Sequence, residues 1–149
     1  MKRKRPAKEF ATAWLFEAFD RDPTYCQKRM FGCLAAYVRG QMVMVLAEDP
    51  GEKSYRGRDY GFDLWDGVMF PTERAFHESL MKDFPGLVPH PVLGKWLYLP
   101  ARHEDFESMA RDLARRIALG DRRLGIEPGM KERKAAKRGV KKKAPRRRP

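Results

Sequence analysis

Every aromatic residue of this 149-residue chain lies in its middle part. The three Trp, five Tyr and nine Phe residues all fall between Phe10 and Phe106, and Val140 is the only β-branched residue from Lys131 onward. A domain needs such side chains for its core, because burial of apolar surface offsets the conformational entropy lost on folding. We therefore expect one folded domain over residues 7–121, which is an ordinary domain size.

The two ends of the chain carry the positive charge. Five Lys or Arg residues precede the first acid, Glu9, and residues 122–149 contain thirteen Lys or Arg but only two acids. The formal charge of the whole chain is +12, whereas that of residues 9–121 is −4. Segments rich in charge and poor in apolar side chains do not fold. Residues 1–6 and 122–149 are therefore predicted to be basic disordered arms.

Basic arms on an acidic body indicate a polyanionic partner. Each phosphate that a Lys or Arg neutralises releases condensed counterions, and flexible cationic segments contact phosphates rather than base edges. We therefore predict association with the phosphate backbone of DNA or RNA, without sequence specificity. The residues expected to bind are Lys2, Arg3, Lys4, Arg5, Lys134, Lys137, Arg138, Lys141, Lys142, Lys143, Arg146, Arg147 and Arg148.

Several function classes lack their sequence signals. The apolar segment of a signal peptide does not follow the basic N-terminus, and no apolar run reaches the roughly 18 residues of a membrane span. Nucleotide-binding, serine-hydrolase and zinc-protease motifs are absent. Cys26 and Cys33 have neither zinc nor redox spacing. We expect a cytoplasmic protein, associated with the nucleoid if its partner is DNA, with free thiols and no metal, cofactor, membrane contact or catalytic activity.

Hydrophobic periodicity and turn residues predict eight elements in the order α–β–β–β–β–α–β–α. Hairpins about Arg39-Gly40 and Asp66-Gly67 make the sheet mostly antiparallel, with about five strands, and three helices can cover one face. In the first helix, a 3.6-residue spacing places Phe16 on the polar side. The expected fold is a two-layer α+β domain, with helices over 7–19, 72–84 and 104–119 and strands over 30–38, 42–46, 60–65, 68–70 and 95–99.

One stretch resembles a known family. The run Arg29-Met30-Phe31-Gly32, an apolar strand, Gly40, Met42 and a second apolar strand resembles the N-terminal domain of the TfoX (Sxy) competence-regulator family, which is similar to YjbR (MmcQ)-like proteins. The match is most specific over residues 29–48. The resemblance implies a small α+β fold with an antiparallel sheet. It also implies a regulatory or nucleic-acid-linked role without established catalysis.

Two features of the folded part are secondary candidates for a site. The loop with Tyr55, Arg56 and Arg58 mixes aromatic rings with cations around a glycine, a combination that can stack on bases and hold phosphate. His90, in a proline-punctuated loop, and the carboxylates between Asp59 and Asp66, with Asp63 between them, could supply acid–base or metal-binding groups. A turn position accounts equally for Asp66, and the outward face of a strand for Asp63.

Three hypotheses follow from these features. The first is a non-catalytic regulatory or accessory protein that associates with nucleic acid through its basic arms. The alternative is a protein-interaction module whose folded body binds a protein partner, with the arms serving solubility or localisation. The third is a small enzyme that uses the His90 loop and the Asp59 to Asp66 region.

Overall fold

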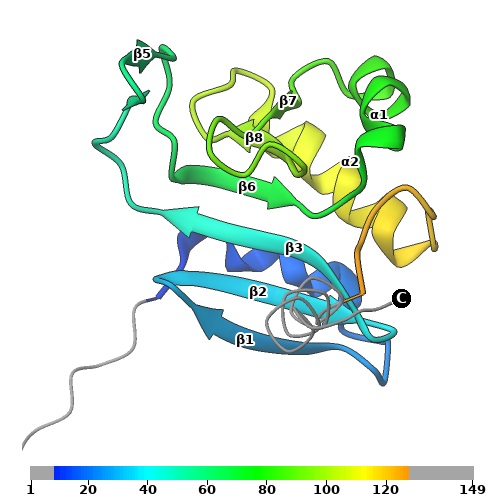
Figure 1. Ribbon diagram of the computed structural model, residues 1–149. Coiled ribbons are helices and arrows are strands. Elements are labelled where there is room, and N and C mark those ends of the chain that lie inside the picture. The colour runs from blue at the N-terminus through cyan, green and yellow to red at the C-terminus, as the bar shows by residue number, and fades with distance from the viewer. Residues whose placement is uncertain (1–8, 128–149) are drawn as a thin grey trace, which may run out of the picture.

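The computed structural model describes residues 9–127, which form a two-layer α+β domain (Figure 1). Six antiparallel strands pair in the order β1-β2-β3-β6-β8-β7, and β4 and β5 form a separate two-stranded ribbon. The expected fold class is confirmed. The strands are β1 (Cys26–Met30), β2 (Cys33–Val38), β3 (Gln41–Glu48), β4 (Ser54–Tyr55), β5 (Arg58–Asp59), β6 (Asp66–Phe70), β7 (Val88–Pro89) and β8 (Leu97–Pro100).

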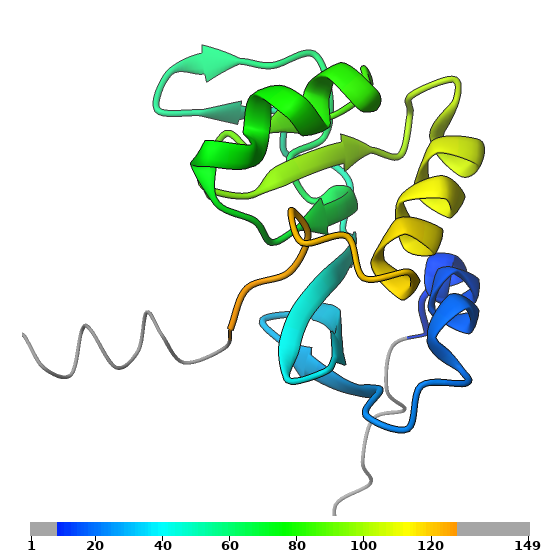
Figure 2. The same ribbon diagram turned by 90° about the vertical axis from the view of Figure 1, so that its right-hand side faces the viewer.

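The helices pack on one face of the sheet, as expected. Figure 2 shows η1 (Ala11–Phe19) and α2 (Phe106–Ala118) side by side against that face. The short η2 (Arg74–Phe76) leads into α1 (His77–Asp83), whose Leu80 belongs to the same core cluster. Phe106, Ala110, Leu113 and Ile117 of α2 are buried, and Gly120 follows the helix with a φ of +90°, a conformation that favours glycine.

The first helix differs from its expected form, because η1 is a 3-10 helix. With three residues per turn, side chains at i and i+3 share a face. Phe10, Ala13, Phe16 and Phe19 therefore point to the core together, and Phe16 is only 2% exposed. The placement of Phe16 on the polar side was wrong, since it assumed 3.6 residues per turn.

Two-residue turns join the first three strands. Met30 pairs with Cys33 and Val38 with Gln41, which leaves Phe31-Gly32 and Arg39-Gly40 as the connections. The hairpin about Arg39-Gly40 is confirmed, and β3 is covered on both faces between β2 and β6. The expected strand over 30–38 is interrupted at Phe31, and β1 before it was not predicted, because its central residues are polar and exposed.

The predicted hairpin about Asp66-Gly67 is wrong. Both residues begin β6, which pairs with β3 on one side and β8 on the other, and residues 60–65 form no strand. A side chain at Gly67 would place its Cβ 2.3 Å from the Leu99 carbonyl oxygen. This glycine therefore serves the close approach of two strands and not a turn.

Within residues 9–127, no helix lies on the opposite face of the sheet, which we call the helix-free face. A second apolar cluster lies there, with Val45, Met69 and Tyr98 at its centre. Side chains from the loops before β6 and β8, including Trp65 and Trp96, partly cover it. The Tyr98 hydroxyl donates to the Asp63 carbonyl at 2.6 Å and accepts from the Asp66 amide at 2.8 Å, so this buried phenol is satisfied.

The segment 122–127, expected to begin the basic arm, packs against the domain instead. Leu124 is 3% exposed, the Thr72 hydroxyl donates to the Arg123 carbonyl at 2.5 Å, and Ile126 pairs with Met42 at the start of β3. Buried apolar surface and satisfied backbone groups hold this segment in place. The boundary drawn after residue 121 is therefore too early, and the remainder of the arm, 128–149, lies outside the described residues.

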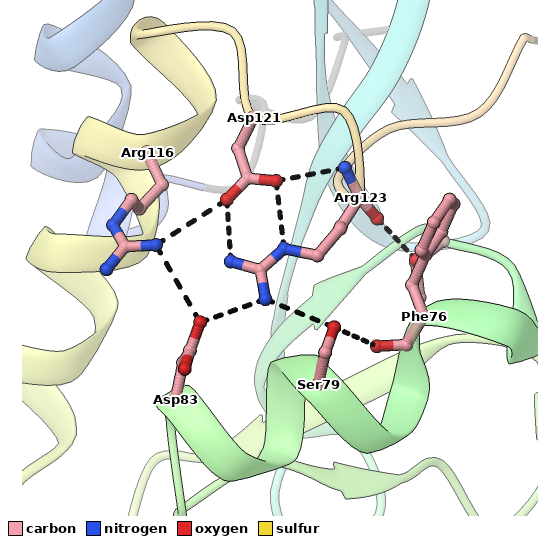
Figure 3. Close-up of polar contacts among 7 residues, drawn as sticks. Phe76, Ser79, Asp83, Arg116, Asp121 and Arg123 are labelled. Atoms are coloured by element: carbon pink, nitrogen blue, oxygen red, sulfur yellow. Dashed lines mark hydrogen bonds and ion pairs between the residues drawn. The ribbon is translucent and has the colours of Figure 1, made fainter.

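An ion-pair cluster fixes this segment to α1 and α2 (Figure 3). Arg123 donates Nε and Nη2 to the two oxygens of Asp121, at 3.0 and 2.8 Å, and Nη1 to Asp83 at 2.9 Å. Arg116 of α2 approaches both carboxylates, at 3.6 Å from Asp121 and 3.9 Å from Asp83. The hydrogen bond from Arg123 holds the pKa of Asp121 below its ordinary value.

Candidate nucleic-acid interface

Several exposed features gather at one end of the sheet, which we call the ribbon end. Pairing of Leu34 with Leu46, and of Glu48 with Asp66, places the β1–β2 turn and the β4–β5 ribbon beyond the same strand ends. In Figure 1 both lie on the left, with the ribbon projecting above the body. The ribbon end therefore brings together the β1–β2 turn and the β4–β5 ribbon.

The ribbon holds the three secondary candidates from the sequence. Its strands are joined by Arg56-Gly57, and guanidinium groups lie over both of its tyrosines. The guanidinium carbon of Arg56 is 5.2 Å from the ring centroid of Tyr55, and that of Arg58 is 5.1 Å from that of Tyr60. These contacts hold the cations beside the rings by cation–π attraction while leaving the guanidinium edges available for phosphate.

Strand β1 adds two exposed cations that sequence analysis did not single out. The Lys28 ammonium lies 5.2 Å from the Tyr37 ring centroid on the helix-free face, and the Arg29 guanidinium lies 5.8 Å from that of Phe10 on the helical face. Alternation along a strand sends neighbouring side chains to opposite faces. An edge strand with charge on both faces resists pairing with other chains and presents its cations to solvent.

The chain enters the domain at this same end. The Glu48 carboxylate accepts hydrogen bonds from the Ala11 amide, at 2.9 Å, and from the amide and hydroxyl of Thr12, at 2.8 and 2.6 Å. These bonds anchor the start of η1, where amide groups would otherwise lack partners. Phe10, near the first described residue, thus lies beside Arg29 of β1.

The cations of the ribbon end do not form ion pairs with carboxylates of residues 9–127. Within residues 9–127, ion pairs use Arg39, Arg115, Arg116 and Arg123, none of which belongs to β1 or the ribbon. Glu52 and Asp59 flank the ribbon cations in sequence and lower the local net charge. Asp49 and Asp63 of the same loop add two more carboxylates, so the ribbon end alone is close to neutral.

The arm residues predicted to bind nucleic acid lie outside the described residues. These are Lys2, Arg3, Lys4, Arg5, Lys134, Lys137, Arg138, Lys141, Lys142, Lys143, Arg146, Arg147 and Arg148. Their role stays a prediction. The structure places the points at which the arms join the body at opposite ends of β3, since Ile126 pairs with Met42 and η1 begins at Glu48.

His90 is a structural residue of the helix-free side. It is 1% exposed, its Nε2 lies 2.7 Å from the Leu64 carbonyl, and its Nδ1 accepts from the amides of Val92 and Leu93 at 3.0 and 3.1 Å. These partners select the neutral ring with the proton on Nε2, and burial lowers its pKa. Both nitrogens are occupied, so His90 has no group to offer a substrate.

The acidic residues near His90 do not converge on it. Asp59 is exposed at the end of the ribbon, Asp63 accepts from the Gly51 amide at 3.0 Å, and Asp66 begins β6. In residues 9–127 no group of three His, Cys, Asp or Glu side chains could hold a metal ion. The geometry of this part of the chain therefore does not assemble the acid–base site considered from the sequence.

The remaining titratable candidates are dispersed. His77 lies on α1 with Nε2 2.8 Å from the Lys95 carbonyl, and His103 accepts from the Asp105 amide at 3.0 Å before α2. Cys26 is exposed, Cys33 is half-buried, and neither forms a disulfide.

Comparison with models of known protein families, with curated proteins and with solved structures finds no match to this chain. Across residues 9–127, no helix is long and apolar enough to cross a membrane. The resemblance to the TfoX and YjbR families stays a prediction.

Proposed function

We propose that this protein is a small, non-catalytic regulatory or accessory protein that associates with DNA or RNA through its basic arms. The observation that carries the proposal is the separation of charge. Residues 9–127 contain sixteen Lys or Arg and nineteen Asp or Glu, a formal charge of −3, whereas residues 1–8 carry +5 and residues 128–149 carry +10. A body of this charge does not attract phosphate by itself, so the arms supply the attraction.

Two further observations support this role. The ribbon end offers Lys28, Arg29, Arg56 and Arg58 outside the ion pairs of the described residues, next to the point where the N-terminal arm begins. The resemblance of residues 29–48 to the TfoX N-terminal domain agrees with a nucleic-acid-linked role. A cytoplasmic location, with nucleoid association if the partner is DNA, belongs to the same proposal.

Truncation tests which segment carries the binding. The full chain, a chain lacking residues 128–149, a chain lacking residues 1–8 and residues 9–127 alone are compared on the same fluorescent duplex by anisotropy. Loss of 128–149 should weaken binding most, because it removes eleven of the Lys and Arg residues. Residues 9–127 should not bind detectably. Full affinity in residues 9–127 would contradict the proposal and move the site to the folded body.

The alternative, a protein-interaction module, has one observation in its favour. Among the described residues, strand β1 pairs only with β2, so its outer edge could accept an added strand, the mode by which several peptide-binding domains work. The positive charges of β1 would repel another basic strand and would attract an acidic extended peptide. An affinity for such a peptide that survives removal of both arms, without nucleic-acid binding by the full chain, would favour this alternative.

A further inference from the structure

The turn between β1 and β2 contains a phenylalanine, Phe31, with a disfavoured backbone conformation and an exposed side chain. Phe31 has a φ of +49° and is 96% exposed. The left-handed region is disfavoured for side chains with a Cβ, and glycine, asparagine and aspartate are the residues that normally occupy it in such turns. The residue is thus strained in backbone and unburied in side chain. The same conformation occurs at Arg39 and Arg56, so the exposed ring, and not the backbone, is the unusual feature of this turn.

Two other turns of the chain provide internal comparisons. Arg39-Gly40 and Arg56-Gly57 join strands with the same two-residue geometry, with φ values of +55° and +76°, and of +53° and +79°. In both the first residue is an exposed arginine, and Arg39 also forms an ion pair with Asp22. The backbone of this turn therefore does not require an aromatic ring, and the ring of Phe31 supports no neighbour in the fold.

The surroundings of Phe31 match a platform for an unstacked base. Arg29 lies two residues away along β1, about 7 Å, and Lys28 adds a cation on the other face of the strand. The tyrosines of the ribbon have guanidinium groups over their rings, whereas the ring of Phe31 is open to solvent. Proteins that bind single strands combine such open rings with nearby cations that hold the backbone.

We propose that the Phe31 turn is a base-stacking site for single-stranded nucleic acid, with Lys28 and Arg29 holding the adjacent phosphates. The inference rests on the proposed function, since the arms bring the polyanion to the body, and it adds a substrate class. A duplex keeps its base faces covered by neighbouring bases, so Phe31 selects single strands or unpaired ends. Stacking uses the π-face that every base has, so the contact does not depend on the nucleotide sequence.

The test separates stacking from charge. The full chain is titrated by anisotropy with an oligothymidine of about 16 nucleotides, and with an abasic strand of the same phosphate count. The full chain should bind the strand that carries bases about 5- to 100-fold more tightly. Phe31→Asn should bind both strands with the affinity that the unaltered chain has for the abasic strand. Equal affinity of the unaltered chain for the two strands would overturn the inference while leaving the proposed function intact. Absence of binding to either strand would refute both.

Further variants distinguish an aromatic contact from an apolar one. Phe31→Trp should keep the preference for bases, and Phe31→Leu should lose it. If Phe31→Leu keeps the preference for bases, the contact is apolar and not aromatic, and the inference is overturned. If Phe31→Asn loses binding to anionic vesicles but keeps its binding to oligonucleotides, the ring contacts lipid, and the inference is likewise overturned. Phe31→Asn should also raise the Tm by about 2–4 °C, because asparagine tolerates the left-handed conformation. Lowered stability in this variant would show a structural role for the ring and count against the inference.

Discussion

At the scale of single residues, His90 shows how burial decides whether a titratable group can act. The side chain lies between the rings of Trp65 and Tyr98, with centroid distances of 4.5 and 4.8 Å, and its two nitrogens are engaged by backbone groups. Protonation would place a charge in this apolar surrounding and remove the acceptor on Nδ1. The ring therefore links the loop before β6 and its own loop to β8, and it does not serve as an acid or base.

This arrangement predicts a stability that depends on pH. The pKa of His90 in the folded protein is lowered by burial, whereas in the unfolded chain it lies near 6.5. The unfolded state therefore binds more protons below that value, and the free energy of unfolding should fall as the pH drops from about 7 to 5. Urea unfolding across this range, with His90→Asn for comparison, measures the effect, and the variant should show a weaker pH dependence. An NMR titration in which the folded ring protonates at or above its ordinary pKa would contradict this reading.

Gly67 allows an equally direct prediction. An added Cβ would lie 2.3 Å from a backbone oxygen of β8, so β6 and β8 would have to separate. Gly67→Ala should lower the free energy of unfolding by about 1–3 kcal/mol, the usual cost of overpacking a well-packed region. Gly94→Ala is the control, because its nearest neighbour would be a flexible arginine terminus at 3.5 Å. Chemical denaturation of both variants gives the comparison, and an unaffected Gly67→Ala protein would rule out the close approach.

At the scale of elements, the segment after α2 belongs to the fold through a few specific contacts. Arg122 and Arg123 are adjacent and chemically identical, yet only Arg123 reaches Asp121 and Asp83. Arg123→Met should lower the free energy of unfolding by about 1–2 kcal/mol, while Arg122→Met should change it by less than about 0.5. The difference should shrink at acid pH, because Asp121, whose pKa is lowered, loses its charge as the pH falls through that value. Equal effects of the two variants would show that the cluster in Figure 3 does not stabilise the protein.

The elements also show what the sequence could predict. Helix α2 and the hairpin about Arg39-Gly40 are evident in the sequence, because their local pattern and their burial agree. The Asp66-Gly67 hairpin was wrong because a glycine needed for strand contact looks the same in sequence as a glycine needed for a turn. The first amides of η1 bond to Glu48, more than 35 residues away, and a window of local sequence does not contain such a contact.

Only part of the candidate interface could be predicted from the sequence. The ribbon with Tyr55, Arg56 and Arg58 could be singled out from its composition, whereas β1 gave no signal because its central residues are polar and exposed. Phe31 was read as a strand residue within an apolar run. The signal that could have identified its turn was Gly32, because a glycine that separates two strand-forming segments also ends the turns at 39–40 and 56–57.

At the scale of the whole molecule, the proposed function gives the body and the arms separate tasks. The body, with a charge of −3 over residues 9–127, provides a rigid sheet with an exposed ring and cations at its ribbon end. The arms provide charge, joined at opposite ends of β3. Long-range attraction then depends on the arms and on ionic strength, whereas any preference among nucleic acids depends on the body.

The salt dependence of nucleic-acid binding by the full chain tests this central claim most directly. If about six phosphates are engaged, the logarithm of the binding constant on a duplex should fall with the logarithm of salt concentration at a slope of roughly −5. Affinity should then drop roughly 1,000-fold between about 50 and 200 mM salt, and a scrambled duplex should give the same curve. Binding that ignores salt, or no binding at low salt, would contradict the account.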